Sequence, residues 1–247
     1  MKILGVIPAR YASSRFPGKP LVDIMGTSMI MRVYQQAKKC SLLNDVIVAT
    51  DDERILEHVH AHGGKAMMTS ADHQSGTDRC REVLEKNTAD FDVVINIQGD
   101  EPFIDPAQIE ELIQCFNDPQ AQIASLIRKI ADPGILFNPN KVKAVIDKNH
   151  FALYFSRHPI PFQKNLPEDQ WLDAQSYFLH VGLYGYRSDV LKQISDLAVS
   201  PLEKSESLEQ LRWLENGFKI KLSETQHEAI GVDVPEDLKT LLRTFGK

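Results

Sequence analysis

The sequence predicts an α/β protein with a mostly parallel, doubly wound (Rossmann-like) sheet and a smaller, partly antiparallel lobe. Through the first half of the 247 residues, short apolar runs alternate with segments of helical periodicity. This is the pattern of consecutive β-α-β units. From about residue 123 the apolar runs become strand-like and lie closer together, which favours antiparallel pairing. We therefore expect a single domain over residues 1–247, within which residues of about 123–199 form the lobe.

The first half supplies the parallel sheet and its covering helices. Buried strands are predicted at residues 3–7, 45–50, 65–69 and 91–98. Helical periodicity predicts helices at residues 28–40, from Asp52 to Gly63, at 77–86 and from Pro106 to about 116. Asp51 or Asp52 can cap the second helix, and Thr77 or Asp78 can cap the third. Because strands and helices alternate, we expect helices on both faces of the sheet.

The second half is predicted to hold the lobe and a return to the sheet. Strand-like runs lie at residues 123–130, 142–146, 177–186 and 218–222. A proline-rich passage at residues 157–162 and a polar stretch at 163–173 separate two of them. Residues 200–216 have the spacing of one amphipathic helix, which Gly217 would stop. Pro235 is placed to begin a final helix.

The composition excludes several classes of protein. The formal net charge of −6 provides no general basic face for nucleic acid, although it does not exclude a local nucleotide site. Cys40, Cys80 and Cys115 are widely separated, which argues against disulfides or a structural zinc site. No run has the length and apolarity of a signal peptide or a membrane span. We therefore expect a cytoplasmic protein with neither nucleic-acid nor membrane partners.

The first strand leads into a stiff loop that carries three cations, Arg10, Arg15 and Lys19. Several prolines restrict its backbone, while Gly18 permits a ligand to approach closely. Such a group of cations suits an oligophosphate. The alternative is an ordinary solvated basic turn. The loop is not a Walker A motif, because Pro20 stands where that motif needs a serine or threonine.

Two acidic segments are candidates for a metal site. Asp100 follows the predicted central strand, and ligands of open parallel sheets collect at the carboxyl ends of strands. Asp233 lies before the last helix, where Glu236 and Asp237 are better explained by the helix dipole. Magnesium typically takes one or two protein carboxylates and completes its shell with water and phosphate oxygens. Asp100 and Asp233 are therefore the expected Mg²⁺ ligands.

Other candidate contacts are weaker when each is taken alone. Ser75 and Gly76 can present hydroxyl and backbone groups to a flat base edge, or they can simply belong to a helix start. Arg157 offers a guanidinium suited to a carboxylate. His180 and Tyr184 would share one face of a strand. A core role for His180 and a solvated helix position for Glu209, next to Gln210, explain the pattern equally well.

Residues 8–20 resemble the signature loop of the CMP-sugar-acid synthetases. Residues 73–79 are similar to the His-x-Ser-Gly-Thr-[Glu/Asp]-Arg segment of the 3-deoxy-manno-octulosonate (Kdo) cytidylyltransferase family, and the later motifs favour Kdo over sialic acid. The resemblance covers nearly the whole chain. It implies a nucleotidyltransferase domain that transfers CMP from CTP to the anomeric hydroxyl of Kdo, releasing pyrophosphate and giving CMP-Kdo for lipopolysaccharide biosynthesis.

The resemblance also implies roles for individual residues. Catalysis would depend on Lys19, Asp100 and Asp233, the last two holding Mg²⁺. The residues implied for nucleotide binding are Pro8, Ala9, Arg10, Arg15, Lys19, Ser75, Gly76 and Gln98. Those implied for the sugar acid are Gln98, Arg157, His180, Tyr184, Glu209 and Gln210. A homodimer is implied as well, with the lobe at about 123–199 serving sugar binding and the subunit contact.

Several alternatives stay open from the sequence. The acceptor could be sialic acid or a modified Kdo, such as an amino-substituted variant. A nucleotide-sugar glycosyltransferase shares the sheet and the metal-binding acid, but the loop with Arg10, Arg15 and Lys19 argues against it. A catalytically silent nucleotide-binding regulator is the alternative from another class. The number of Mg²⁺ ions and the extent of lobe closure are also undecided.

Overall fold

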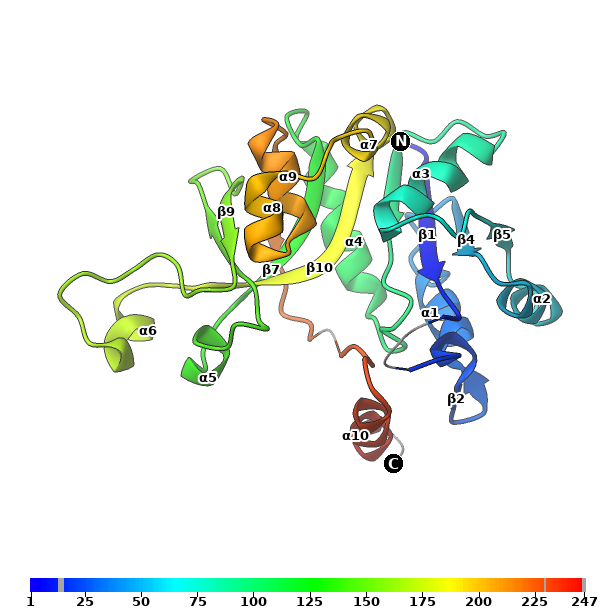
Figure 1. Cartoon of the computed structure of the whole chain (residues 1–247), viewed down its shortest axis with the longest axis horizontal. Helices are drawn as coiled ribbons and strands as arrows, with labels where there is room; N and C mark the ends of the chain where they lie inside the picture. Colours follow the sequence, from blue (N-terminus) through cyan, green and yellow to red (C-terminus); the bar gives the residue numbers. More distant parts are fainter. Residues whose placement is uncertain (13–15, 229, 246–247) are drawn as a thin grey trace. The chain divides into compact units, whose positions relative to one another are not determined.

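The computed structural model describes residues 1–12, 16–228 and 230–245 (Figure 1). The chain forms two compact units. The first comprises Met1–Glu110, Gly185–Ser195 and His227–Lys247, and the second comprises Glu111–Tyr184 and Asp196–Gln226. Two elements pass from one unit into the other along the chain, namely helix α4 (Pro106–Gln114) and strand β10 (Phe178–Arg187).

The first unit contains the predicted parallel sheet. Its strands are β1 (Ile3–Ala9), β4 (Asp45–Thr50), β5 (Ala66–Met68) and β6 (Val93–Asn96). Strand β1 pairs in parallel with both β4 and β6, and β4 pairs in parallel with β5. Every residue of β6 is buried, as expected for a central strand covered on both faces. The prediction of a mostly parallel α/β sheet is confirmed.

The helices of the first unit follow the predicted alternation, except that the helix over Ser188–Ser195 was not predicted. They are α1 (Met29–Ala37), α2 (Glu53–Ala61), α3 (Gly76–Lys86), α7 (Ser188–Ser195) and α10 (Pro235–Phe245). A short turn of 3₁₀ helix, η1 (Lys19–Leu21), and a hairpin of β2 (Asp23–Ile24) and β3 (Thr27–Ser28) precede α1. Figure 1 shows α2 beside β5 at one end of this sheet.

The cap of helix α3 differs from the prediction. Ser75 is the N-cap, whereas Thr77 or Asp78 was expected. The Ser75 hydroxyl accepts the N–H of Asp78 at 3.1 Å, and the Asp78 carboxylate accepts the N–H of Ser75 at 3.2 Å. This reciprocal capping box explains the shift, because Asp78 satisfies the cap residue from the third helical position.

The second unit has a mixed strand arrangement. Its strands are β7 (Ile123–Lys129), β8 (Lys143–Ile146), β9 (Ala152–Ser156), β11 (Ile220–Glu224) and the part of β10 up to Tyr184. Strand β8 is antiparallel to both β9 and β10, while β7 and β11 are parallel. The prediction of a partly antiparallel region is confirmed, although β9 was not predicted as a strand.

The helical elements of the second unit are short. They are η2 (Cys115–Asn117), α5 (Pro133–Leu136), η3 (Glu168–Gln170), α6 (Trp171–Ala174), α8 (Pro201–Glu206) and α9 (Glu209–Glu215).

The prediction of one helix over residues 200–216 is wrong. The segment forms α8 and α9, with a break at Ser207, whose φ of 53° is left-handed, and at the extended Leu208. The Arg157 guanidinium donates to the carbonyls of Glu206 at 2.7 Å and Ser207 at 3.4 Å. A side chain distant in sequence thus binds carbonyls that a continuous helix would use.

Separate apolar clusters stabilise the two units. In the first, Ile24 and Met29 pack with Val232 and Leu241, which attaches the last helix to the hairpin region. In the second, Trp171 and Tyr177 stack with their ring centroids 6.2 Å apart and join Ile130 and Leu136. Within the described ranges, no helix is both long enough and apolar enough to cross a membrane.

Candidate active site

Lys19, Asp100 and Asp233 meet at the carboxyl end of β6, although they are far apart in sequence. The Lys19 Nζ lies 2.9 Å from Asp100 Oδ2 and 3.9 Å from Asp233 Oδ1. It also donates to the carbonyl of Val232 at 2.8 Å. Lys19 is mostly buried, with 15% of its side chain exposed, whereas 58% of the Asp233 side chain is exposed. The three residues predicted to be catalytic therefore form one cluster that solvent can reach.

The loop after β1 presents Lys19 through a tight backbone turn. The N–H of Gly18 donates to the carbonyl of Tyr11 at 3.0 Å, and Gly18 has a left-handed φ of 71°. A Cβ at Gly18 would also lie 3.2 Å from the Tyr11 ring. Glycine is therefore required here both by conformation and by the close approach of Tyr11.

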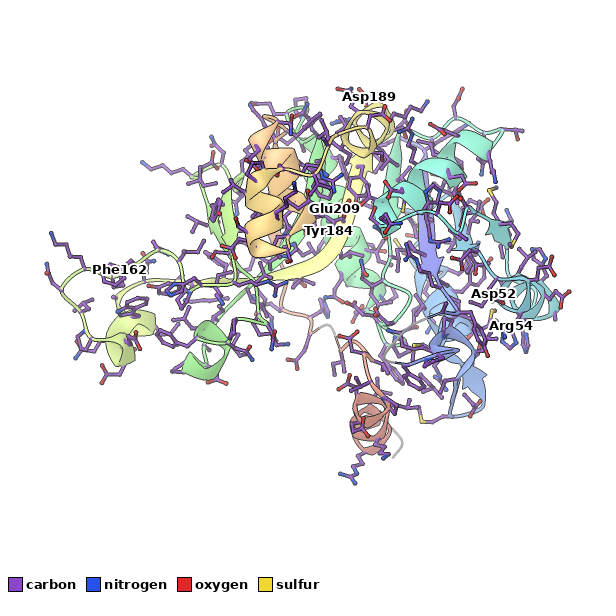
Figure 2. The ribbon with its side chains drawn as sticks, in the orientation of Figure 1. Asp52, Arg54, Phe162, Tyr184, Asp189 and Glu209 are labelled. Carbon is purple, nitrogen blue, oxygen red and sulfur yellow. The ribbon has the colours of Figure 1, made fainter. Side chains whose placement is uncertain are left out.

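An arginine that the sequence analysis missed supports this loop. Arg54 of α2 places its guanidinium carbon 3.3 Å from the centroid of the Tyr11 ring. Asp52 holds that guanidinium by two hydrogen bonds, of 2.9 and 2.6 Å (Figure 2). A stacked cation fixes the aromatic ring on which Gly18 rests. Sequence spacing alone could not have indicated a contact between α2 and this loop.

Asp100 occupies a position that depends on close backbone packing. A Cβ on the preceding Gly99 would lie 2.5 Å from the carbonyl oxygen of Pro8, so only glycine fits without movement. The carbonyl of Asp100 accepts the N–H of Val232 at 2.9 Å. These two contacts place the loop after β6 against the end of β1 and against the segment that carries Asp233.

The segment before α10 orients Asp233. The carboxylate of Asp237 accepts the N–H groups of Asp233 at 2.8 Å and Val234 at 3.0 Å. This is the structural role expected of an acid in the first turn of a helix. Asp237 thereby fixes the backbone at Asp233 and leaves the Asp233 carboxylate directed to the cluster with Lys19.

A second acidic residue lies next to Asp100. Burial, reinforced by the negative charge of Asp100, raises the pKa of Glu101 to about 7. The sequence analysis did not identify Glu101 as unusual, because its burial is a property of the folded loop.

The cluster fits a hard divalent cation. Asp100 and Asp233 provide carboxylate oxygens, which are the ligands that Mg²⁺ prefers. Among the residues that the structure describes, no group of three or more histidines, cysteines and acids is arranged to hold a metal. Two carboxylates are nevertheless the usual protein contribution where substrate phosphates and water complete the shell.

The remaining nucleotide candidates of the first unit lie at the ends of β1 and β6 and at the start of α3. Pro8 and Ala9 end β1, and Gln98 follows β6. Arg10 is exposed and donates from Nη2 to the carbonyl of His73, just before Ser75 and Gly76 begin α3. Arg15 lies outside the described residues.

Arg79, the last residue of the second motif, has a structural role. It is fully buried and donates to Asp51 at 2.5 Å and to Thr69 at 2.7 Å. A buried guanidinium needs such partners to offset its desolvation. The motif thus combines Ser75 and Gly76, which form the start of α3, with Arg79, which anchors α3 in the core.

His180 and Tyr184 of the second unit are neighbours, as their spacing on one strand predicted. Their ring centroids lie 5.3 Å apart, and the Tyr184 ring meets Trp213 of α9 edge-on at 5.3 Å. His180 Nε2 lies 2.9 Å from the hydroxyl of Ser125. Burial lowers the pKa of His180 to about 4, so the imidazole is neutral at physiological pH.

Arg157 has more backbone partners than the sequence suggested. Its guanidinium donates to the carbonyls of Glu206, Ser207 and Pro139, at 2.7, 3.4 and 3.2 Å respectively. Its own N–H donates to the Glu206 carboxylate at 2.9 Å. Arg157 therefore braces the second unit, and its longest hydrogen bonds are those of the two terminal nitrogens.

The other two sugar candidates lie together at the start of α9. Glu209 is its first residue and is half-buried, and Gln210 follows it and is buried. The structure thus gathers two sets of predicted residues, one within each unit.

Comparison with known proteins agrees with this geometry. The cytidylyltransferase family model matches residues 4–221. The 3-deoxy-manno-octulosonate cytidylyltransferase of Bacteroides thetaiotaomicron is 55% identical over 97% of this chain and 96% of its own. The enzyme of the same name from Parabacteroides distasonis is 52% identical, covering 98% and 97%. The chain belongs to the 3-deoxy-manno-octulosonate cytidylyltransferase family.

A solved structure supports the same assignment. A CMP:2-keto-3-deoxy-manno-octonic acid synthetase complexed with CTP is 44% identical and superposes with a TM-score of 0.93, covering 100% of this chain and 99% of its own. The predicted family and fold are confirmed. This cytidylyltransferase is an enzyme of the nucleotidyltransferase class, which excludes the silent regulator considered from the sequence.

Proposed function

We propose that the enzyme transfers CMP from CTP to the anomeric hydroxyl of Kdo, releasing pyrophosphate and giving CMP-Kdo for lipopolysaccharide biosynthesis. The observation that carries this proposal is the convergence of Lys19, Asp100 and Asp233 at the carboxyl end of β6. A cation and two carboxylates at such a position suit a metal-bound nucleoside triphosphate.

In this proposal, the loop after β1 binds the triphosphate. Lys19 and Arg10 would bind its negatively charged oxygens, with Arg15 as the third cation. Pro8 and Ala9 would line the nucleotide through the backbone, and Ser75, Gly76 and Gln98 would contact its base and sugar. Phosphate oxygens gain charge-assisted hydrogen bonds from such groups.

Asp100 and Asp233 would hold Mg²⁺. The bound ion would neutralise phosphate charge and lower the pKa of the attacking hydroxyl. Because Lys19 contacts both carboxylates, its ammonium balances their charge and is released towards the phosphates when the nucleotide arrives. In the transfer, the sugar oxygen bonds to the α-phosphorus, the bond to pyrophosphate breaks, and the hydroxyl proton leaves to solvent. Positioning and charge stabilisation would dominate the rate.

The acceptor would be bound by the set in the second unit, together with Gln98. Arg157 is the proposed partner of the Kdo carboxylate through its terminal nitrogens, and neutral His180 with Tyr184 would contact hydroxyl groups. Glu209 and Gln210 would complete these contacts. We further propose a cytoplasmic homodimer, with the lobe at about 123–199 serving sugar binding and the subunit contact.

Pyrophosphate release tests the proposal. The purified enzyme is given each of the four ribonucleoside triphosphates with Mg²⁺, in the presence and absence of Kdo, sialic acid and an amino-substituted Kdo. We expect release only with CTP and Kdo together. Faster release with sialic acid or with the amino variant would change the acceptor. A nucleotide-sugar glycosyltransferase would release no pyrophosphate in this assay, because it needs a nucleotide sugar as its donor.

A further inference from the structure

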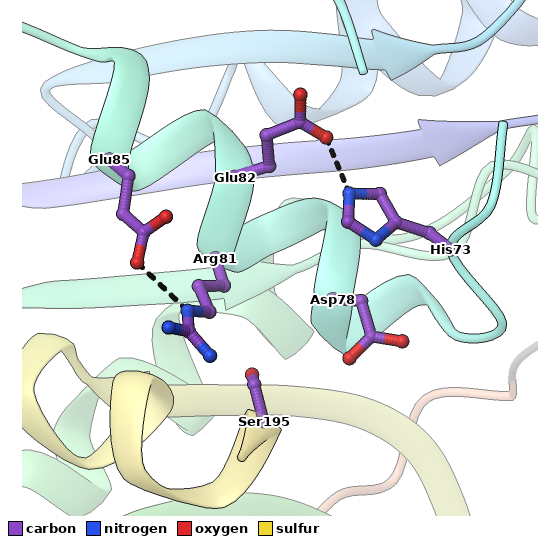
Figure 3. A pocket seen from close by; sticks show the side chains of 6 residues that line it. All are labelled: His73, Asp78, Arg81, Glu82, Glu85 and Ser195. Atoms are coloured by element: carbon purple, nitrogen blue, oxygen red, sulfur yellow. Dashed lines mark hydrogen bonds and ion pairs between the residues drawn. The ribbon is translucent and has the colours of Figure 1, made fainter. Parts of the chain in front are cut away.

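A polar pocket of about 320 Å³ lies in the first unit, behind the start of helix α3. Its lining residues are His73, Asp78, Arg81, Glu82, Glu85 and Ser195 (Figure 3). Two pairs of side chains lie in it, namely His73 hydrogen-bonded to Glu82 and the ion pair of Arg81 with Glu85. The first pair joins α3 to the segment that precedes it, whereas the second pair lies within α3 itself. This difference indicates a function for the first pair.

The Glu82 carboxylate holds both ends of the segment that precedes α3. Its Oε2 accepts the N–H of Ser70 at 2.8 Å and also accepts a hydrogen bond from His73 Nε2. Its other oxygen pairs with Lys86 at 2.6 Å, one turn further along the helix. Glu82 therefore fixes residues 70–73 to α3, whereas Glu85 pairs with Arg81 of its own helix.

The charge of Glu82 persists at neutral pH. Burial raises the pKa of its carboxyl, but the hydrogen bonds from Lys86, the Ser70 amide and His73 together outweigh burial and lower this pKa to about 2. The group that holds residues 70–73 is therefore an ionised carboxylate at neutral pH.

The same segment reaches the proposed nucleotide site. The carbonyl of His73 accepts the Nη2 hydrogen bond of Arg10, which follows β1. Two residues later, Ser75 caps α3 and Gly76 begins it. Glu82, His73 and Arg10 thus form a continuous chain of contacts from the helix to the triphosphate loop.

We propose that Glu82 is a positioning residue for nucleotide selection, which holds residues 70–75 so that Arg10 and the Ser75–Gly76 turn keep the arrangement that CTP requires. This inference rests on the proposed function, because it assumes that Arg10 and the turn contact CTP. Glu82 would act through the segment that it holds, by its hydrogen bonds with Ser70 and His73. Its loss should therefore weaken CTP binding and base discrimination more than the chemical step.

The test compares Glu82→Ala with the matched control Glu85→Ala, which removes an acid from the same helix and pocket. We expect Glu82→Ala to raise the KM for CTP about tenfold, since several hydrogen bonds to a charged group are lost. The ratio of kcat/KM for CTP over UTP should fall several-fold, while the KM for Kdo stays within twofold. Glu85→Ala should match the wild type, and Glu82→Gln should fall between them.

A second variant tests the same chain of contacts. It also keeps the proposal testable if Glu82→Ala fails to fold. His73→Ala removes the ring but keeps the carbonyl that binds Arg10, so it should reproduce part of the Glu82 effect. The double variant should be no worse than Glu82→Ala alone, because the contact that His73→Ala removes is one of those that Glu82 makes. Additive effects, or unchanged CTP affinity and CTP-over-UTP preference in folded Glu82→Ala and His73→Ala, would overturn the inference.

Calorimetric titration of CTP without sugar separates this inference from the proposed function. If the wild type binds CTP but releases no pyrophosphate with Kdo, the proposed acceptor is wrong, and the binding comparison still decides the role of Glu82. Weaker CTP binding by Glu82→Ala than by Glu85→Ala supports it, and equal binding refutes it.

Discussion

Lys19 and Asp100 form a salt bridge of 2.9 Å between a proposed phosphate-binding cation and a proposed metal-binding carboxylate. Each residue thus balances the charge of the other in this structure. A nucleotide with its metal would replace this pairing by two new ones, so neither charge would be left without a partner. The metal-binding role proposed for Asp100 and the phosphate-binding role proposed for Lys19 can therefore be tested by separate substitutions.

Replacing Asp100 by Asn should abolish turnover and leave the fold intact. The amide cannot supply the negative charge that a divalent cation needs, and the loss should reach roughly a thousandfold or more in rate. Pyrophosphate release at saturating Mg²⁺ measures this effect. Glu57→Gln, at an exposed position of α2, serves as the control. Turnover near that of the wild type would remove Asp100 from the metal site.

Replacing Lys19 by Ala should weaken the binding of CTP strongly and that of CMP only slightly. The ammonium is proposed to contact the outer phosphates, which CMP lacks. Calorimetric titration with the two nucleotides gives the comparison directly. Equal losses for both would instead indicate that Lys19 mainly supports the loop through its contact with Val232.

Replacing Gly99 by Ala should destabilise the protein and disturb the site together. The new Cβ would lie 2.5 Å from the Pro8 carbonyl, and such overpacking typically costs about 1–3 kcal/mol of unfolding free energy. Because Asp100 follows directly, its carboxylate should move and turnover should fall. Gly182→Ala is the matched control, since no atom lies within 4 Å of its Cβ position. Equal urea midpoints for the two variants would contradict this interpretation.

Acidification should destabilise the second unit through His180. Its pKa of about 4 in the folded protein lies below the usual 6.5, so the unfolded chain binds the proton more tightly. The stability due to neutral His180 is complete above pH 6.5 and is lost as pH falls towards 4, by up to about 1.4 kcal/mol per pH unit. Urea unfolding between pH 7 and 4.5 should show a steeper loss for the wild type than for His180→Asn. Parallel slopes would exclude His180 as the cause.

Replacing Arg157 by Lys should lower kcat/KM for Kdo roughly tenfold to a thousandfold, since an ammonium cannot copy the planar fork. CTP affinity should stay nearly unchanged. The loss of carbonyl contacts to Pro139 and Ser207 should also lower the unfolding free energy by about 1–3 kcal/mol. A variant that is less stable but keeps its normal kcat/KM for Kdo would leave Arg157 a structural brace only.

The sequence predicted most of the parallel sheet because its signals are local. Apolar runs such as residues 45–50 and caps such as Asp52 depend on near neighbours in the chain. The break at Ser207 could not be predicted in this way, since Arg157 binds the carbonyls there from a distant segment. Strand β9 was missed for a related reason, because Leu153 is exposed and the run lacks a clear buried face.

The candidate site shows the same division. Its residue types were recognisable because cations on a glycine- and proline-rich loop and acids after a strand carry their own chemistry. The partners that orient them were not recognisable. Arg54 on Tyr11, and Glu82 on His73, join segments whose proximity arises only in the folded chain.

The attachment of the last helix has a consequence for how this enzyme matures. Asp233 belongs to the segment that Val232 and Leu241 anchor to Ile24 and Met29. A ribosome-bound chain that has emerged only as far as β11 already contains every strand that the structure describes, yet it lacks one of the two proposed metal carboxylates. Catalytic competence would therefore arrive last during synthesis, and a chain cut short before Gly231 could still bury much of its core while remaining unable to consume CTP.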